Sequence, residues 1–124
     1  MKNIIVKFSL VVFISFSALY VHSQCTNTTS YGTATAPSNN TPVTITTVQY
    51  ESEYNTISNV VAGETYQSSS DCGSYITVRR GTYDGTVVAH GWSPLSWTAT
   101  VSGTYYIHYN TDAACGTAST SCTT

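Results

Sequence analysis

The sequence predicts an all-β protein, an antiparallel β-sandwich of the jelly-roll or immunoglobulin-like type that is stapled by disulfides. Three observations lead to this prediction. No window of the chain spaces its apolar residues at the helical period. Short β-rich runs recur about every eight to twelve residues between turn signals. Four cysteines follow an export signal in a chain of 124 residues, a length that suits one domain.

Residues 1–23 have the three-part pattern of a secretory signal peptide. Lys2 and Lys7 give a positive start, an apolar stretch covers residues 8–19, and residues 21–23 place β-branched and small side chains before a cleavage site. The apolar stretch is too short for a comfortable membrane span. We therefore expect cleavage after residue 23 and no membrane span in the mature chain. An uncleaved membrane anchor is the alternative.

Residues 24–42 are rich in Thr, Ser, Asn and Ala, and they include Pro37 and Pro42. This composition predicts a loosely structured leader with one short edge strand. The β-sandwich domain is expected to occupy residues 43–124. Apolar residues alternate at Val43 and Ile45, and then, after a bulge, at Val48 and Tyr50, which predicts the first strand of the domain.

The later strands are predicted from β-branched and aromatic runs that turn-forming residues interrupt. These runs are residues 54–61, 65–69, 75–79, 87–90, 95–101 and 103–110. The Asp84-Gly85 pair predicts a hairpin between the third and fourth runs. The last run has aromatic residues on both faces, with Tyr105 on one and Tyr106 on the other. We expect it to be a central strand.

Charged residues are scarce in the exported part of the chain. Only Arg79 and Arg80 carry positive charge after residue 23, against six carboxylates. Two adjacent cations cannot neutralise a track of phosphates, which excludes nucleic acid as a partner. Thr, Ser, Asn and Tyr fill the exposed positions, a composition typical of durable extracellular β-structure. Such a surface also leaves strand edges open to association.

The four cysteines predict two disulfides, because they are even in number and lie in an exported domain of small size. They are Cys25, Cys72, Cys115 and Cys122. If strand directions simply alternate, the turn at Cys72 and the strand end before Cys115 fall at the same end of the sandwich. This favours Cys72–Cys115 with Cys25–Cys122, and the alternative has Cys115 and Cys122 close a small loop. No C-x-x-C spacing supports a zinc site, and we expect no metal and no other cofactor.

Four segments of the chain carry a resemblance to a known type of module. They are residues 62–66 (AGETY), 75–79 (YITVR), 94–99 (PLSWTA) and 102–106 (SGTYY). In this order they resemble the β-sandwich modules of Bacteroidota-type secreted surface proteins, which are similar to pre-peptidase C-terminal-like domains. Residues 50–54 (YESEY) are similar to a Tyr-x-x-Glu-Tyr element that precedes them.

The resemblance implies a non-catalytic, jelly-roll-like sandwich of the kind found in adhesins, accessory modules and surface assemblies. Such modules usually sit in longer proteins, so we expect either a fragment or a module that acts alone.

The residues outside the signal offer no catalytic constellation. There is no Gly-x-Ser-x-Gly motif and no metal-binding histidine pair. His108 is expected at the surface, on an outward strand face. Glu51 and Glu53 could be considered for glycoside hydrolysis, but we expect a solvated pair that limits edge association. The prediction is therefore that the protein is not an enzyme.

Three aspartates in three loops raise the question of calcium, because oxygen-rich loops suit this ion. They are Asp71, Asp84 and Asp112, and no Asp-x-Asp spacing occurs. A turn-forming role is expected for each.

Aromatic residues give the best sequence signal for a binding site. The candidate ligand-binding residues are Tyr83, Trp92, Tyr106 and His108. Tyrosine and tryptophan stack well on sugar rings, because each has a rigid apolar face and a polar tip. The alternative is that these side chains merely cover the core.

Together these features predict a secreted, non-catalytic module for adhesion or extracellular assembly at a bacterial surface. One alternative is a filament subunit whose Thr-rich leader, residues 28–47, adds a strand to a neighbouring copy. Another is a small lectin-like carbohydrate-binding module. The expected partners are further copies of the chain or a cell-surface or extracellular polysaccharide, and the expected location is extracellular or on the cell surface.

Overall fold

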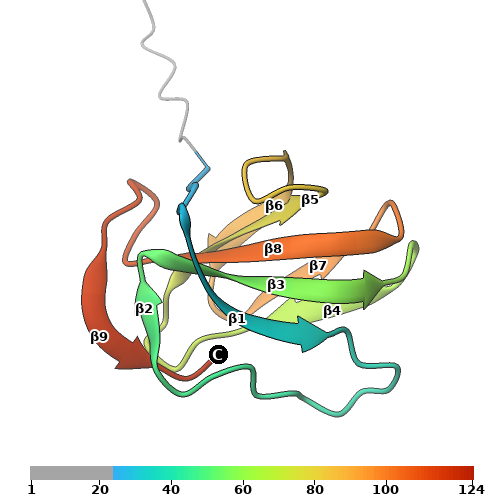
Figure 1. Ribbon diagram of the computed structural model, residues 1–124, viewed down its shortest axis with the longest axis horizontal. Coiled ribbons are helices and arrows are strands. Elements are labelled where there is room, and N and C mark those ends of the chain that lie inside the picture. Colours follow the sequence, from blue (N-terminus) through green and yellow to red (C-terminus); the bar gives the residue numbers. More distant parts are fainter. Residues whose placement is uncertain (1–23) are drawn as a thin grey trace, which may run out of the picture.

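The computed structural model describes residues 24–124, and all regular elements in this range are strands (Figure 1). The main sheet has five strands in the order β1-β3-β8-β5-β6. They are β1 (Thr29–Thr35), β3 (Glu53–Val60), β8 (Gly103–Asn110), β5 (Tyr75–Arg80) and β6 (Thr86–Trp92). Two short sheets complete the fold: β4 (Thr65–Ser68) pairs with β7 (Leu95–Thr98), and β2 (Gln49–Glu51) pairs with β9 (Ala118–Cys122). The predicted disulfide-stapled, all-β fold is confirmed. The predicted signal peptide lies outside the described residues.

Strand β8 is the centre of the main sheet, as its sequence predicts. It pairs antiparallel with β3 on one side and with β5 on the other. Its inner face carries Tyr105, Ile107 and Tyr109, each about 1% exposed.

The Asp84-Gly85 turn between β5 and β6 also forms as predicted. Within residues 24–124, no helix has the length and apolarity that a membrane crossing requires.

The β4–β7 pair packs on the inner face of the main sheet and closes the core. Trp97 of β7 stacks on Tyr105 of β8, with ring centroids 5.1 Å apart, and Tyr66 of β4 contacts Trp97 at the same distance. The indole N–H of Trp97 donates to the Ser68 hydroxyl at 3.0 Å, so its one polar group is satisfied. Burying these side chains against each other is the main favourable contribution to folding.

Residues 24–42 are part of the sandwich and not a separate leader. The one short edge strand predicted there is β1, which runs parallel to β3. Before it, Cys25 and Asn27 are buried. No domain boundary therefore separates these residues from the sheet at residue 43.

The strand predicted from Val43 onward is wrong for residues 43–48. Only Gln49–Glu51 form a strand there. Ile45 and Thr46 share backbone hydrogen bonds with the single residue Thr124, which is too short a partner for a ladder. Val43 stays 51% exposed as a result. Alternation alone does not make a strand when no neighbouring strand is in reach.

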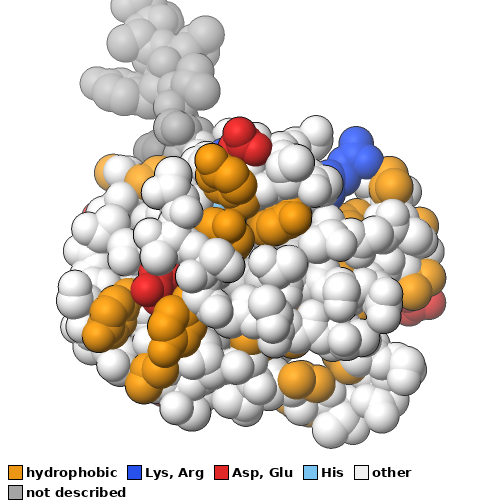
Figure 2. All heavy atoms as spheres, in the orientation of Figure 1, with side chains coloured by type: hydrophobic (Ala, Val, Ile, Leu, Met, Phe, Trp, Pro, Cys, Tyr) orange, Lys and Arg blue, Asp and Glu red, His pale blue; other side chains and the backbone are white. Residues whose placement is uncertain are grey.

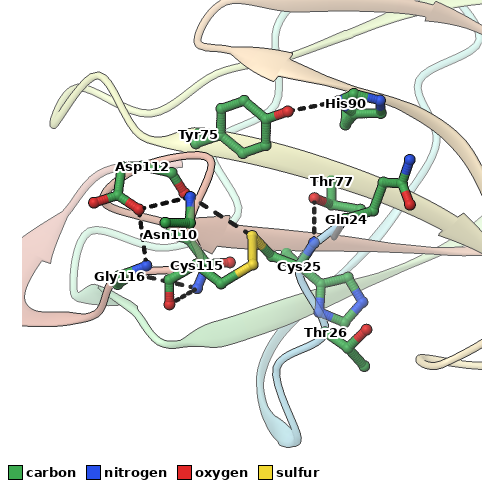
Figure 3. The surroundings of a disulfide bond; sticks show 12 residues. Gln24, Cys25, Thr26, Tyr75, Thr77, His90, Asn110, Asp112, Cys115 and Gly116 are labelled. Atoms are coloured by element: carbon green, nitrogen blue, oxygen red, sulfur yellow. Dashed lines mark hydrogen bonds between the residues drawn. A yellow bond between two sulfur atoms is a disulfide. The ribbon is translucent and has the colours of Figure 1, made fainter. Parts of the chain in front are cut away.

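The disulfides are Cys25–Cys115, which Figure 3 shows, and Cys72–Cys122, so both pairings considered from the sequence are wrong. Residues 24–27 run over the outer face of the main sheet and bring Cys25 to the loop after β8. Strand β9 brings Cys122 back to the turn that holds Cys72, where Asp71 and Thr123 exchange two hydrogen bonds. Simple alternation of strand direction cannot anticipate a segment that crosses the sheet.

Gly32 provides a test of how closely β1 is docked. Its N–H donates to the Asn55 side-chain oxygen at 2.8 Å, and an added Cβ would lie 2.6 Å from that oxygen and 2.7 Å from Ile45 Cγ2. We expect Gly32→Ala to lower the free energy of unfolding by about 1–3 kcal/mol, because β1 must shift outward. Denaturant unfolding measures this change.

The neighbouring substitution Thr33→Ala is the control, because Thr33 is exposed on the same strand. It should change the free energy of unfolding by less than about 0.5 kcal/mol. Equal stability of the two variants would mean that β1 is not packed as described.

Candidate functional site

The outer face of the main sheet is covered at one end by residues 24–27, which we call the N-terminal strap. Arg79 of β5 fastens it: the guanidinium donates to the carbonyl of Gln24 at 3.1 Å, to the carbonyl of Cys25 at 3.3 Å and to the hydroxyl of Thr26 at 2.6 Å. The Cys25 N–H donates to the Thr77 hydroxyl at 3.2 Å, and the Cys25–Cys115 disulfide adds a covalent tie (Figure 3).

His108 lies beneath the strap and is fully buried, so its predicted surface position is wrong. Its Nδ1 accepts the N–H of Asn27 at 2.9 Å, which places the ring proton on Nε2. Burial lowers the pKa of His108 to about 4, the backbone of Tyr83 acts in the opposite direction, and the charge of Arg79 lowers the pKa further. The imidazole is therefore neutral at neutral pH, and it forms a fixed part of the layer buried between the sheet and the strap.

Beside the buried histidine, three tyrosines from three elements meet on the outer face. We call Tyr54 of β3, Tyr83 of the β5–β6 turn and Tyr106 of β8 the tyrosine cluster. The Tyr54 ring stacks on Tyr83 at 5.5 Å with 6° between the planes, and it meets Tyr106 edge-on at 5.8 Å. Tyr54 also lies 5.2 Å from the ring of His108.

The structure therefore brings together three of the four predicted ligand-binding residues, Tyr83, Tyr106 and His108, with only the two tyrosines reaching the surface. Trp92, the fourth, lies at the end of β6, where it packs edge-on against Tyr75 and is 56% exposed. Tyr54, the ring that joins the others, was missed. The cross-strand pairing of Tyr54 with His108 is the signal that could have identified it.

The glutamates at residues 51 and 53 each accept a specific hydrogen bond. Glu51 and Glu53 are each only 7% exposed, so the predicted solvated pair is wrong. Glu51 accepts the Ser74 hydroxyl at 2.7 Å, and Glu53 accepts the Tyr50 N–H at 2.9 Å. The sequence could not reveal this role, because a buried carboxylate needs specific hydrogen-bond donors and only the fold brings those donors to it.

The three loop aspartates each accept hydrogen bonds close to their own turns. Asp71 accepts the N–H of Thr123 at 2.7 Å, Asp84 accepts the Thr82 hydroxyl at 2.8 Å, and Asp112 accepts the N–H groups of residues 114 and 116. Asp84 and Asp112 therefore have the turn-forming role predicted for them, whereas the Asp71 side chain joins its turn to the segment after β9.

A second candidate site lies on the side of the sandwich where β1 and β4 are the outermost strands. A cleft of about 640 Å³ opens between them, walled by residues 37–43. The core side chains Ile57, Trp97 and Ile107 line its interior. We call the β1 edge, the β4 edge and this cleft the open side.

Both edges of the open side present unpaired backbone groups. In residues 24–124, β1 pairs only with β3, and β4 pairs only with β7. The Glu64 carbonyl accepts the Ala99 N–H at 3.0 Å, which sets the alternation of the β4–β7 ladder. It follows that the N–H and C=O groups of Thr65 and Gln67 point away from β7 toward the cleft side. Neither β1 nor β4 contains a charged residue or a proline.

Comparison with protein-family models, with curated proteins and with solved structures finds no match for this chain.

The buried histidine predicts a pH dependence of stability. Because folding lowers the pKa of His108 from 6.5 to about 4, the unfolded chain binds a proton between these values that the folded chain does not. The contribution of His108 is complete above pH 6.5 and falls as the pH drops toward 4, by about 3 kcal/mol in total. We expect His108→Gln to have a flatter dependence of the unfolding free energy on pH between 7 and 4.5 than the unsubstituted chain.

His90→Gln is the matched control, since His90 is exposed. This variant should keep the pH slope of the unsubstituted chain. A slope lost in His90→Gln and kept in His108→Gln would contradict the assignment.

Proposed function

We propose that this protein is a secreted, non-catalytic module of extracellular assembly at a bacterial surface, and that a second copy of the chain docks on its open side. The observation that carries the proposal is the cleft between two unpaired, uncharged strand edges, with core side chains at its base. An incoming edge there would satisfy backbone groups and cover apolar surface in the same step.

Export is supported by two independent features, the signal-peptide pattern and the disulfides. The first residues have the signal-peptide pattern, all four cysteines are paired in disulfides, and such bonds persist in oxidising compartments. The resemblance to modules of secreted surface proteins supports a bacterial surface as the location.

We favour a second copy of the chain as the occupant, because the strand edges lack the usual protection and the chain carries little charge. Edge strands in monomeric proteins are commonly protected by lysine, by proline or by a covering segment. Strands β1 and β4 carry neither lysine nor proline. Residues 37–43 wall the cleft, but in the described chain they form no backbone hydrogen bond with either strand. The low charge of the chain gives little repulsion between copies. If β1 of one copy meets β4 of the next, the contact is head-to-tail and propagates into a filament.

This arrangement differs from the filament considered from the sequence, in which the Thr-rich leader, residues 28–47, adds a strand to a neighbouring copy. Strand β1 is held in its own sheet, and the Ala36 N–H bonds the Ser58 carbonyl at 2.8 Å just beyond it. An added strand would therefore come to the edge of β1, which stays in place.

A proline at Gln67 tests the proposal. Gln67→Pro removes an N–H that points away from β7, so the fold should persist while strand addition at β4 is blocked. We expect the oxidised chain 24–124 to self-associate with rising concentration in sedimentation velocity, and Gln67→Pro to reduce this association at least about tenfold. Thr33→Lys should act similarly at the edge of β1.

Gln67→Thr is the control, because it keeps both the N–H and the strand preference, and it should associate like the unsubstituted chain. A chain that stays monomeric at the highest concentration reached, and shows no filaments by negative-stain microscopy, would refute the proposal.

A further inference from the structure

We propose that the tyrosine cluster on the outer face is a binding site for neutral saccharides, separate from the open side. The site would take the apolar face of a pyranose ring against Tyr83 and Tyr106, while hydroxyl groups of the sugar bond the phenol groups. This inference does not depend on self-association, because it concerns the opposite face of the main sheet.

The first support is that the rings form an ordered aromatic surface. Figure 2 shows hydrophobic side chains gathered on the outer face near the β5–β6 turn, with an acidic side chain beside them. Tyr54 is fixed between Tyr83, Tyr106 and His108 by ring contacts of 5.2 to 5.8 Å. His108 is in turn fixed by the strap through Asn27. A surface ordered before binding loses little entropy when a ligand arrives.

The second support is unused hydrogen-bonding capacity. The hydroxyl groups of Tyr54, Tyr83 and Tyr106 have no hydrogen-bond partner in the described part of the chain. By contrast, the core hydroxyl of Tyr105 donates to the Val101 carbonyl at 2.7 Å, and the hydroxyl of Tyr66 accepts the Val61 N–H at 3.0 Å. Aromatic rings with polar tips directed to solvent suit a ligand that is apolar on one face and rich in hydroxyls at its rim.

The third support is the balance of charge, which selects a neutral ligand. The guanidinium of Arg79, the cation in register with Tyr106, is engaged by the strap and by the Gly85 carbonyl at 2.7 Å. Burial lowers the pKa of the Arg79 guanidinium, and the charge of the nearby Asp84 carboxylate acts on this pKa in the opposite direction. His108 is uncharged at neutral pH. An anionic ligand would therefore find the Arg79 guanidinium already engaged and His108 uncharged, whereas the Asp84 carboxylate can accept a hydroxyl hydrogen.

The experiment uses the oxidised chain 24–124 with a panel of neutral gluco-, xylo-, manno- and chito-oligosaccharides, measured by saturation-transfer NMR and by titration. At least one oligosaccharide should bind. Tyr83→Ala and Tyr106→Ala should each weaken that binding about two- to tenfold, the range that single ring contacts contribute. Tyr83→Phe should retain most of the ring contribution.

Trp92→Ala is the matched control, since Trp92 is more exposed than any cluster ring but lies outside the cluster. It should bind as the unsubstituted chain does. Near-ultraviolet circular dichroism confirms that each variant keeps its fold. Gln67→Pro, which is altered only at the open side, should keep full saccharide affinity.

Three results would overturn the inference. They are no binding by any neutral oligosaccharide of the panel, a preference for anionic saccharides, or equal losses in Trp92→Ala and the cluster variants. The last result would indicate adsorption to any exposed aromatic side chain.

Discussion

The outer face of this sandwich depends on one constraint, the N-terminal strap. Without residues 24–27, the main sheet would expose His108, Thr77 and the polar end of β8 to water. The strap covers them and makes several hydrogen bonds to them. The Cys25 N–H donates to the Thr77 hydroxyl, the Asn27 N–H donates to Nδ1 of His108, and the Asn27 side chain donates to the carbonyls of Glu53 and Tyr109. Buried polar groups are tolerated because these bonds are made. The disulfide at Cys25 keeps the strap from leaving.

Much of the fold could be predicted because it depends on local signals. Strands β3 to β8 lie where aromatic and β-branched runs alternate between turns, and the hairpin at Asp84-Gly85 follows from the residues of its turn. The central place of β8 also followed from its own composition. Such features need no knowledge of distant residues.

The features that sequence analysis missed all depend on distant partners. Strand β1 pairs in parallel with β3. Parallel neighbours are joined by a long connection and not by a tight turn, so no turn residues in the sequence predict this pairing. The strap residue Asn27, 81 residues away along the chain, covers His108. The alternation of side chains along β8 predicts an exposed position for His108, but the strap buries it. The disulfide pairing follows from the same crossing. For the candidate site, the aromatic residues named from the sequence include two members of the tyrosine cluster, but the strand register was needed to add Tyr54 and to place Trp92 outside it.

The position of β8 in the sequence has a consequence for the order of folding. It spans residues 103–110, so it is synthesised after the other four strands of its sheet, although it joins β3 to β5. Until it is present, the two halves of the sheet have no common strand, and the cysteines that close both bridges come later still. Long-range pairing of this kind is slow to form. The complete sheet and both disulfides can therefore form only once nearly all of the chain has been made, so folding of this domain has to follow its synthesis.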